Sequence, residues 1–118
     1  MALKHAEPGE VVDLRPLGER LAESRTHAIV RTESFEAIRL VLPARTEIGS
    51  HRLSGRIMLH CIEGAVEIGF PQGARRLGAG DWIYLEGQAD HSLHAVADAS
   101  LLMTVLFDAE KAGDAATG

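Results

Sequence analysis

Two histidines with glycines close by offer the clearest chemistry in this chain of 118 residues. His51 follows Gly49 by two positions, and His91 comes 40 residues later, downstream of Gly80. If the strands that carry the two histidines pair in one barrel, both imidazoles can face the same cavity and hold a metal ion or a small ligand. The spacing therefore predicts a binding site, without naming a reaction.

The elements that must position these histidines are short strands. Runs rich in β-branched and aromatic residues alternate with turn residues from His27 onward, a pattern typical of a sandwich or barrel. A helical bundle would need apolar residues at a spacing of about 3.6, and only Val11 to Ser24 approaches that spacing. We predict an all-β fold with antiparallel strands in two sheets, preceded by a helical turn or loop around Pro16 and Gly18. The predicted strands are 27–31, 35–42, 57–62, 65–70, 74–77, 81–85, 91–96 and 101–107.

Two of these runs, 57–62 and 101–107, are apolar on both faces. A strand with one solvated face should alternate between apolar and polar residues, so something must cover the outer face here. The N-terminal 25 residues or a second copy of the chain could do so, and we expect a homodimer with isologous packing. We divide the chain into an N-terminal arm (1–25), one barrel domain (26–107) and a flexible C-terminal tail (108–118).

Composition narrows the class of protein. A hydrophobic content of 46% in 118 residues fits a single core. Cys61 is the only cysteine and the chain opens without a charged and then apolar leader, so we expect a cytoplasmic protein. No apolar run reaches the roughly 20 residues of a membrane span. A net charge of -5, with only Arg75 and Arg76 clustered, argues against nucleic acid as a partner.

Four residues match two short motifs of a known superfamily. His51 and Gly64 stand at the first histidine and the closing glycine of G-x5-H-x-H-x3,4-E-x6-G, and Gly80 and His91 match G-x5-P-x-G-x2-H-x3-N. The chain therefore resembles the cupin superfamily of small RmlC-like proteins. This resemblance implies a double-stranded β-helix, the jelly-roll cupin barrel.

The resemblance also implies one divalent transition metal (Fe, Mn, Ni, Zn or Cu), which the family binds with three histidines and a glutamate. Leu53 replaces the second histidine and Ile57 stands at the position of the glutamate. His51 and His91 are then two of the four family ligands. Two imidazoles alone make a poor site, because catalytic zinc and non-haem iron sites use at least three protein ligands.

A third ligand must come from the strands around the two motif histidines. Simple alternation places His60 and His94 on the outer surface, but a bulge of one residue would turn either into the cavity. Glu47 and Cys61 have the inward parity, although a solvated carboxylate and a small buried hydrophobe are the commoner roles for such residues. The predicted metal ligands are His51, His91 and His60.

Other chemical assignments are few. Tyr84 and His91 are the candidates for acid–base chemistry, but we expect Tyr84 instead to be an aromatic side chain packed in the core. Glu63-Gly64 predicts a hairpin connection between two strands. The chain contains no G-x-S-x-G elbow, Walker loop or dinucleotide-binding fingerprint.

Three functions remain open. The first is a metal-binding cupin that acts as a dioxygenase or isomerase on a small molecule. The second is a metal-free barrel that binds a small apolar or weakly polar ligand as a sensor or binding module, which Leu53 and Ile57 favour because they make the cavity more apolar. The third is a dimerising scaffold. A bound metal, or stabilisation by a ligand without metal, would separate these hypotheses.

Overall fold

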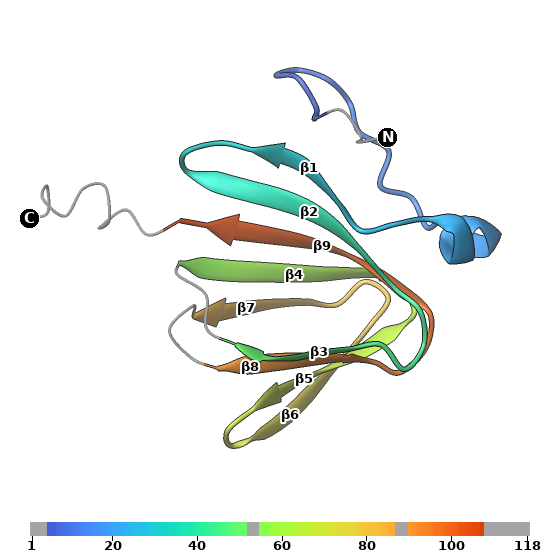
Figure 1. The fold of residues 1–118 in the computed structure, drawn as a ribbon, viewed down its shortest axis with the longest axis vertical. Helices are drawn as coiled ribbons and strands as arrows, with labels where there is room; N and C mark the ends of the chain where they lie inside the picture. Colours follow the sequence, from blue (N-terminus) through green and yellow to red (C-terminus); the bar gives the residue numbers. More distant parts are fainter. Residues whose placement is uncertain (1–4, 52–54, 87–89, 108–118) are drawn as a thin grey trace, which may run out of the picture.

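The computed structural model describes residues 5–51, 55–86 and 90–107, with residues 50 and 51 described by their backbone alone. The described strands form two antiparallel layers (Figure 1): a five-stranded sheet in the order β1-β2-β9-β4-β7 and a four-stranded sheet in the order β3-β8-β5-β6. The elements are η1 (Gly18–Glu23), β1 (His27–Arg31), β2 (Phe35–Leu42), β3 (Glu47–His51), β4 (Arg56–Glu63), β5 (Ala65–Phe70), β6 (Gly73–Gly78), β7 (Trp82–Glu86), β8 (His91–Ala95) and β9 (Ala99–Leu106). The predicted all-β fold class is confirmed. The predicted tail, 108–118, lies outside the described residues.

The core lies between the two sheets and is filled by every second residue of each strand. In β4, Ile57, Leu59 and Cys61 are buried, whereas the intervening His60 is exposed. Neighbouring strands keep the same alternation, because β2 pairs with β9 over its full length without a register shift. The inward residues of these strands form the apolar core between the two sheets.

Strand β3, which carries His51, was not among the predicted strands. Glu47, Gly49 and Ser50 have low β propensity, so the sequence of this segment gives little indication of a strand. Pairing with β8 supplies what the local sequence lacks: Ile48 lies opposite Leu93, and the register shifts before the strand ends. Tertiary pairing has overridden local propensity here.

The prediction of a hairpin at Glu63-Gly64 is wrong. Strand β4 pairs with β7 and β9, whereas β5 pairs with β6 and β8, so the two residues lead the chain from one sheet to the other. Gly64 has a φ of 82°, and a Cβ atom there would collide with the carbonyl oxygen of Asp98 and lie 2.7 Å from Cα of Ala99. Glycine is needed at this crossing because another strand's backbone passes against it.

The outer face of the five-stranded sheet is covered in part by the N-terminal segment. The predicted helical turn near Gly18 is present as η1, which buries Leu21 and ends where the chain turns into β1. Arg39 and Val41 of β2 are buried on this outer face. Folding back of the segment before β1 thus covers the outer face at β2, which lies beside the two-faced runs of β9 and β4 rather than within them. The described residues include no helix long and apolar enough to span a membrane.

The other part of the outer face carries exposed aromatic side chains. Trp82 is 59% exposed and Tyr84 is 44% exposed on edge strand β7. The interpretation of Tyr84 as a core aromatic is therefore wrong, since Ile83 and Leu85 are the inward residues of this strand. The hydroxyl of Tyr84 instead donates a hydrogen bond of 2.6 Å to Oε2 of Glu86.

The homodimer stays a prediction, and this exposed surface is where we expect it to form. Burial of Trp82 would remove a large aromatic surface from water, which favours association. We expect light scattering at micromolar concentration to give the mass of two chains, and Trp82→Glu to give the mass of one. Val11→Glu, at a residue that is 93% exposed on the N-terminal segment, is the control and should leave the mass unchanged. A monomeric parent protein would contradict the prediction.

Candidate functional site

A small cavity of about 100 Å³ lies between the two sheets. Its lining consists of eight hydrophobic side chains and two polar residues from seven strands of both layers. The lining residues are Leu40, Ile48, Ile57, Leu59, Ile68, Leu85, His91, Ser92, Leu93 and Met103. A cavity of this size and lining suits an apolar group of a few carbon atoms, since a dry cavity of roughly 150 Å³ holds benzene.

The wall of the cavity is apolar where the family motif has a metal-binding glutamate. Ile57, which stands at the family's glutamate position, is 4% exposed and lines the cavity. Leu59, two residues further along β4, lines it as well. Leu53, at the second histidine position, lies outside the described residues.

His91 brings an imidazole to the cavity. It shares the inward parity of β8 with Leu93 and Ala95, which are both buried in the core. Its ring meets that of Phe70 edge to face, with centroids 5.7 Å apart and an interplanar angle of 86°. This contact orients the ring of the first residue of β8. Strand β8 begins at the end of the sandwich opposite η1 (Figure 1). The inward position predicted for His91 is confirmed.

His51 and His91 are direct partners in the β3–β8 ladder. The side chain of His51 lies outside the described atoms, so its role as a ligand stays a prediction. Residues directly opposite each other on paired strands have their side chains next to each other on the same face, so this register would allow the two histidines to share a ligand.

His60 does not join this site. It lies on the outer face of the five-stranded sheet, where it is exposed and pairs with Trp82 and Leu102. The one-residue bulge that could have turned it inward is absent from the described β4–β7 ladder, and the register of β4 against β9 shifts only after Cys61. His60 therefore lies on the outer surface, as simple alternation along the strand predicted.

The remaining candidates have structural surroundings. Cys61 is fully buried, its Sγ donates to the carbonyl oxygen of Glu63 at 3.4 Å, and burial raises the pKa of its thiol. Glu47 is exposed and lies 3.3 Å from Nδ1 of half-buried His94 across the β3–β8 pair. Neither Glu47 nor Cys61 lines the cavity.

The described residues do not fit a metal centre. Within them, no three histidine, cysteine, aspartate or glutamate side chains lie close enough together to hold a metal ion. His91 is the only described side chain of these types in the cavity lining. A metal at this place would depend on His51 and on further ligands beyond the described side chains.

A second hollow, open and about 470 Å³ in volume, adjoins the cavity. Leu85 and His91 line both spaces, so the two meet at these residues. The second hollow is far more polar than the first. Its lining residues are Phe70, Gln72, Gly73, Arg75, Ile83, Tyr84, Leu85, Glu86 and His91.

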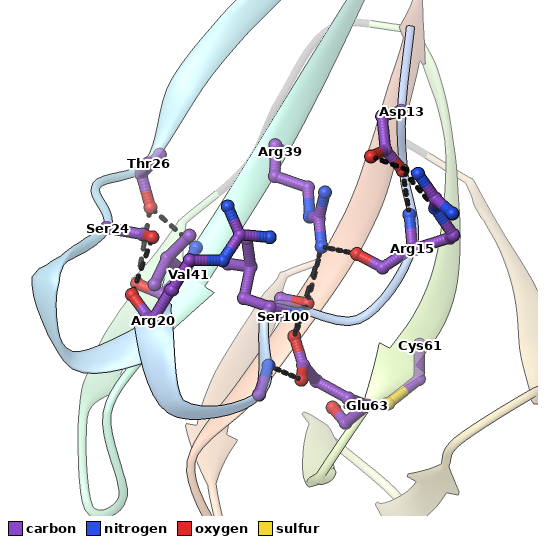
Figure 2. Close-up of polar contacts among 12 residues, drawn as sticks. Asp13, Arg15, Arg20, Ser24, Thr26, Arg39, Val41, Cys61, Glu63 and Ser100 are labelled. Carbon is purple, nitrogen blue, oxygen red and sulfur yellow. Dashed lines mark hydrogen bonds and ion pairs between the residues drawn. The ribbon is translucent and has the colours of Figure 1, made fainter.

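A buried polar network holds the N-terminal segment on the sheet at the other end of the sandwich (Figure 2). Glu63 accepts hydrogen bonds from the backbone amides of Leu17 at 2.9 Å and Gly18 at 3.0 Å, and a short one from the hydroxyl of Ser100. Arg39 donates through Nη2 to the carbonyl oxygen of Arg15 at 2.9 Å and to Ser100 at 3.2 Å. Sequence reasoning missed this network. The one available signal was a lone arginine in the apolar run 35–42.

The charges of this network support one another. Arg39 is 4% exposed, and burial lowers the pKa of its guanidinium, while Glu63 at 3.9 Å opposes that effect. Burial alone would raise the pKa of Glu63, but the hydrogen bonds from Ser100, Leu17 and Gly18 together with Arg39 bring it below its ordinary value. Glu63 therefore stays ionised at neutral pH and anchors the N-terminal segment. The role of the network is structural.

Comparisons with known proteins support the fold. No protein-family model and no curated protein matches the sequence. A conserved protein of unknown function from Streptococcus pyogenes superposes with a TM-score of 0.71 at 22% identity, over 92% of this chain and 96% of that one. A cupin superfamily protein from Desulfitobacterium hafniense gives a TM-score of 0.71 at 15% identity, over 83% and 95%. The cupin domain of Schizosaccharomyces pombe Cnp3 gives 0.68 at 18% identity, over 79% and 71%. The chain thus has the cupin fold, as the resemblance implied.

Proposed function

We propose that this chain is a ligand-binding cupin barrel that takes a small, largely apolar molecule into its interior without a metal. The lining of the cavity carries the proposal: eight hydrophobic side chains surround about 100 Å³, and His91 is the one titratable side chain among the described lining residues. Binding sites for small molecules combine such apolar walls with a few oriented polar groups. His91 is the polar group that would orient the ligand.

The energy available fits a weak and reversible binder. Transfer of three or four methylene groups from water into the cavity is worth about 3 kcal/mol. This corresponds to affinities around the millimolar range once one polar contact is added. A sensor or binding module for an abundant small metabolite works with such affinities.

Thermal unfolding with and without short-chain alcohols tests the cavity. At ten times the dissociation constant, pentanol should stabilise the protein by about 1.4 kcal/mol, a rise in Tm of about 6 °C. Leu59→Phe should abolish this rise, because the larger ring occupies the space that Leu59 leaves open. Met58→Leu is the matched control, since Met58 neighbours Leu59 on β4 but has the outward parity. The proposal fails if pentanol leaves the Tm of the parent protein unchanged.

A metal-binding barrel is the second candidate, and the direct pairing of His51 with His91 favours it. The three-ligand requirement weighs against it, since His60 is on the outer face. Elemental analysis of untagged protein purified without chelator distinguishes the two functions. We expect less than about one tenth of an equivalent of iron, manganese, nickel, zinc or copper, because two imidazoles give a weak site. Near-stoichiometric metal that is lost in both His51→Ala and His91→Ala would instead establish the metal function.

A further inference from the structure

A guanidinium breaks the apolar pattern on the inner face of the four-stranded sheet. Arg75 of β6 lies directly opposite Ile68 of β5, and alternates with buried Leu77 on the inward side of its own strand. Its neighbour Arg76 has the opposite parity and lies across from exposed Glu67. The two arginines that stand together in the sequence therefore belong to different faces of the sheet.

Arg75 ends a row of residues that otherwise lines the cavity. The row crosses the sheet through direct strand partners: Ile48, Leu93, Ile68 and then Arg75 at the edge. The first three residues line the apolar cavity, and Arg75 lines the adjoining polar hollow. The cavity and the guanidinium are thus consecutive along one line of side chains.

The hollow gives the guanidinium a setting in which it can meet a ligand. Leu85 and His91 belong to both spaces, so a molecule with its apolar end in the cavity would extend past them toward Arg75. Nη1 of Arg75 makes a hydrogen bond of 3.2 Å with the carbonyl oxygen of its neighbour Ala74, which leaves the other donors of the guanidinium for further partners. Glu86, the acid in this hollow, accepts the hydroxyl of Tyr84 at Oε2.

We propose that the ligand of this barrel is a short-chain carboxylate, with its hydrocarbon end in the interior cavity and its carboxylate bound by Arg75. The inference rests on the proposed function and names its ligand class. A planar guanidinium matches a carboxylate in geometry as well as in charge. A tail of three to five carbons is what a cavity of about 100 Å³ can take.

Protection of a sheet edge offers another explanation for an inward charge. Strand β6 is an edge of its sheet, and inward-pointing charges discourage edge-to-edge association. Protection of the edge would need a charged residue on β6, but that residue would not have to lie next to the cavity. The row that joins Arg75 to Ile68, and the hollow that Arg75 shares with His91, favour a ligand.

The test compares pentanoate, pentanol and pentylamine, whose five-carbon chains are the same length, by NMR titration in a buffer without carboxylates. We expect the parent protein to bind pentanoate about fivefold more tightly than pentanol, as an ion pair with the exposed guanidinium of Arg75 allows. Arg75→Gln should remove this preference and leave the affinity for pentanol within about twofold. Arg76→Gln is the matched control, with the same loss of charge on the opposite face, and should keep the preference.

The outcomes separate the two proposals. Pentanol binding without a preference for pentanoate, or an equal loss in Arg75→Gln and Arg76→Gln, overturns the role of Arg75 and leaves the apolar binding site standing. Tighter binding of pentylamine than of pentanoate likewise overturns it, because Glu86 would then select the ligand. Failure of all three probes to bind overturns both the ligand class and the proposed function.

Discussion

Gly64→Ala is expected to lower the free energy of unfolding by about 4 kcal/mol, a large loss for a single methyl group. Part of the loss is the cost of a left-handed backbone in a residue with a side chain, about 1–2 kcal/mol. The larger part comes from the new Cβ atom, which would meet the backbone carbonyl of Asp98 and Cα of Ala99. Backbone atoms cannot rotate away as a flexible side chain could, so β4, β5 or β9 must shift.

Urea unfolding of Gly64→Ala beside Gly80→Ala measures this effect. Gly80 has a similar φ of 92°, but a Cβ atom there would have nothing within 4 Å. Gly80→Ala should therefore cost only the backbone term of about 1–2 kcal/mol. Equal losses in the two variants would show that the close approach at Gly64 has no energetic consequence. If Gly64→Ala does not fold while Gly80→Ala does, the expected order holds.

Much of the fold could be predicted because the strongest strands carry their own signals. The predicted limits 35–42 and 65–70 coincide with β2 and β5, since β-branched and apolar runs there end at proline or glycine turns. Strand β3 was missed because its residues have little β propensity and depend on β8 for pairing. The change of sheet at Gly64 was also beyond local reasoning, because a turn within a sheet and a crossing between sheets use the same residue type.

For the candidate site, the sequence could predict only which side chains of a strand face inward and which face outward. Alternation placed His91 inward and His60 outward, and the structure agrees with both. Tyr84 was misplaced because aromatic residues in a strand suggest burial, whereas β7 is an edge strand whose outer side chains stay exposed. The position of Arg75 beside the cavity depends on the pairing of β6 with β5, which no pattern within residues 73–78 contains.

The network of Arg39, Glu63 and Ser100 could not be predicted, since its members lie on three strands far apart in the sequence. A charge inside an apolar run indicates only that some partner must exist, because a buried ion without one is costly. The partner of Arg39 is Glu63, and Glu63 in turn binds the backbone amides of Leu17 and Gly18. The N-terminal arm is thus held by its backbone amides. Such contacts cannot be predicted from the pattern of side chains in the sequence.

Arg39→Met is expected to lower the free energy of unfolding by about 2–4 kcal/mol at neutral pH. Methionine keeps much of the hydrophobic stem but removes the charge 3.9 Å from Glu63 and the donor to Arg15 and Ser100, and the removal of one partner from a buried pair is costly. Arg31→Met is the matched control, because Arg31 forms an exposed ion pair with Glu36 at 3.2 Å, and its loss should stay within about 1 kcal/mol. Urea unfolding of both variants makes the comparison.

The pH dependence of the Arg39→Met loss identifies its cause. The pKa of Glu63 is lower in the folded protein than its ordinary value, so its contribution is present above pH of about 4 and is lost as the pH falls through the folded pKa. The difference in stability between the parent protein and Arg39→Met should therefore narrow as the pH falls below about 4, because a protonated Glu63 no longer needs the guanidinium. Arg39→Met/Glu63→Gln should recover part of the loss at neutral pH. A loss that is independent of pH, with no recovery in the double variant, would assign the effect to packing of the arginine stem rather than to its charge.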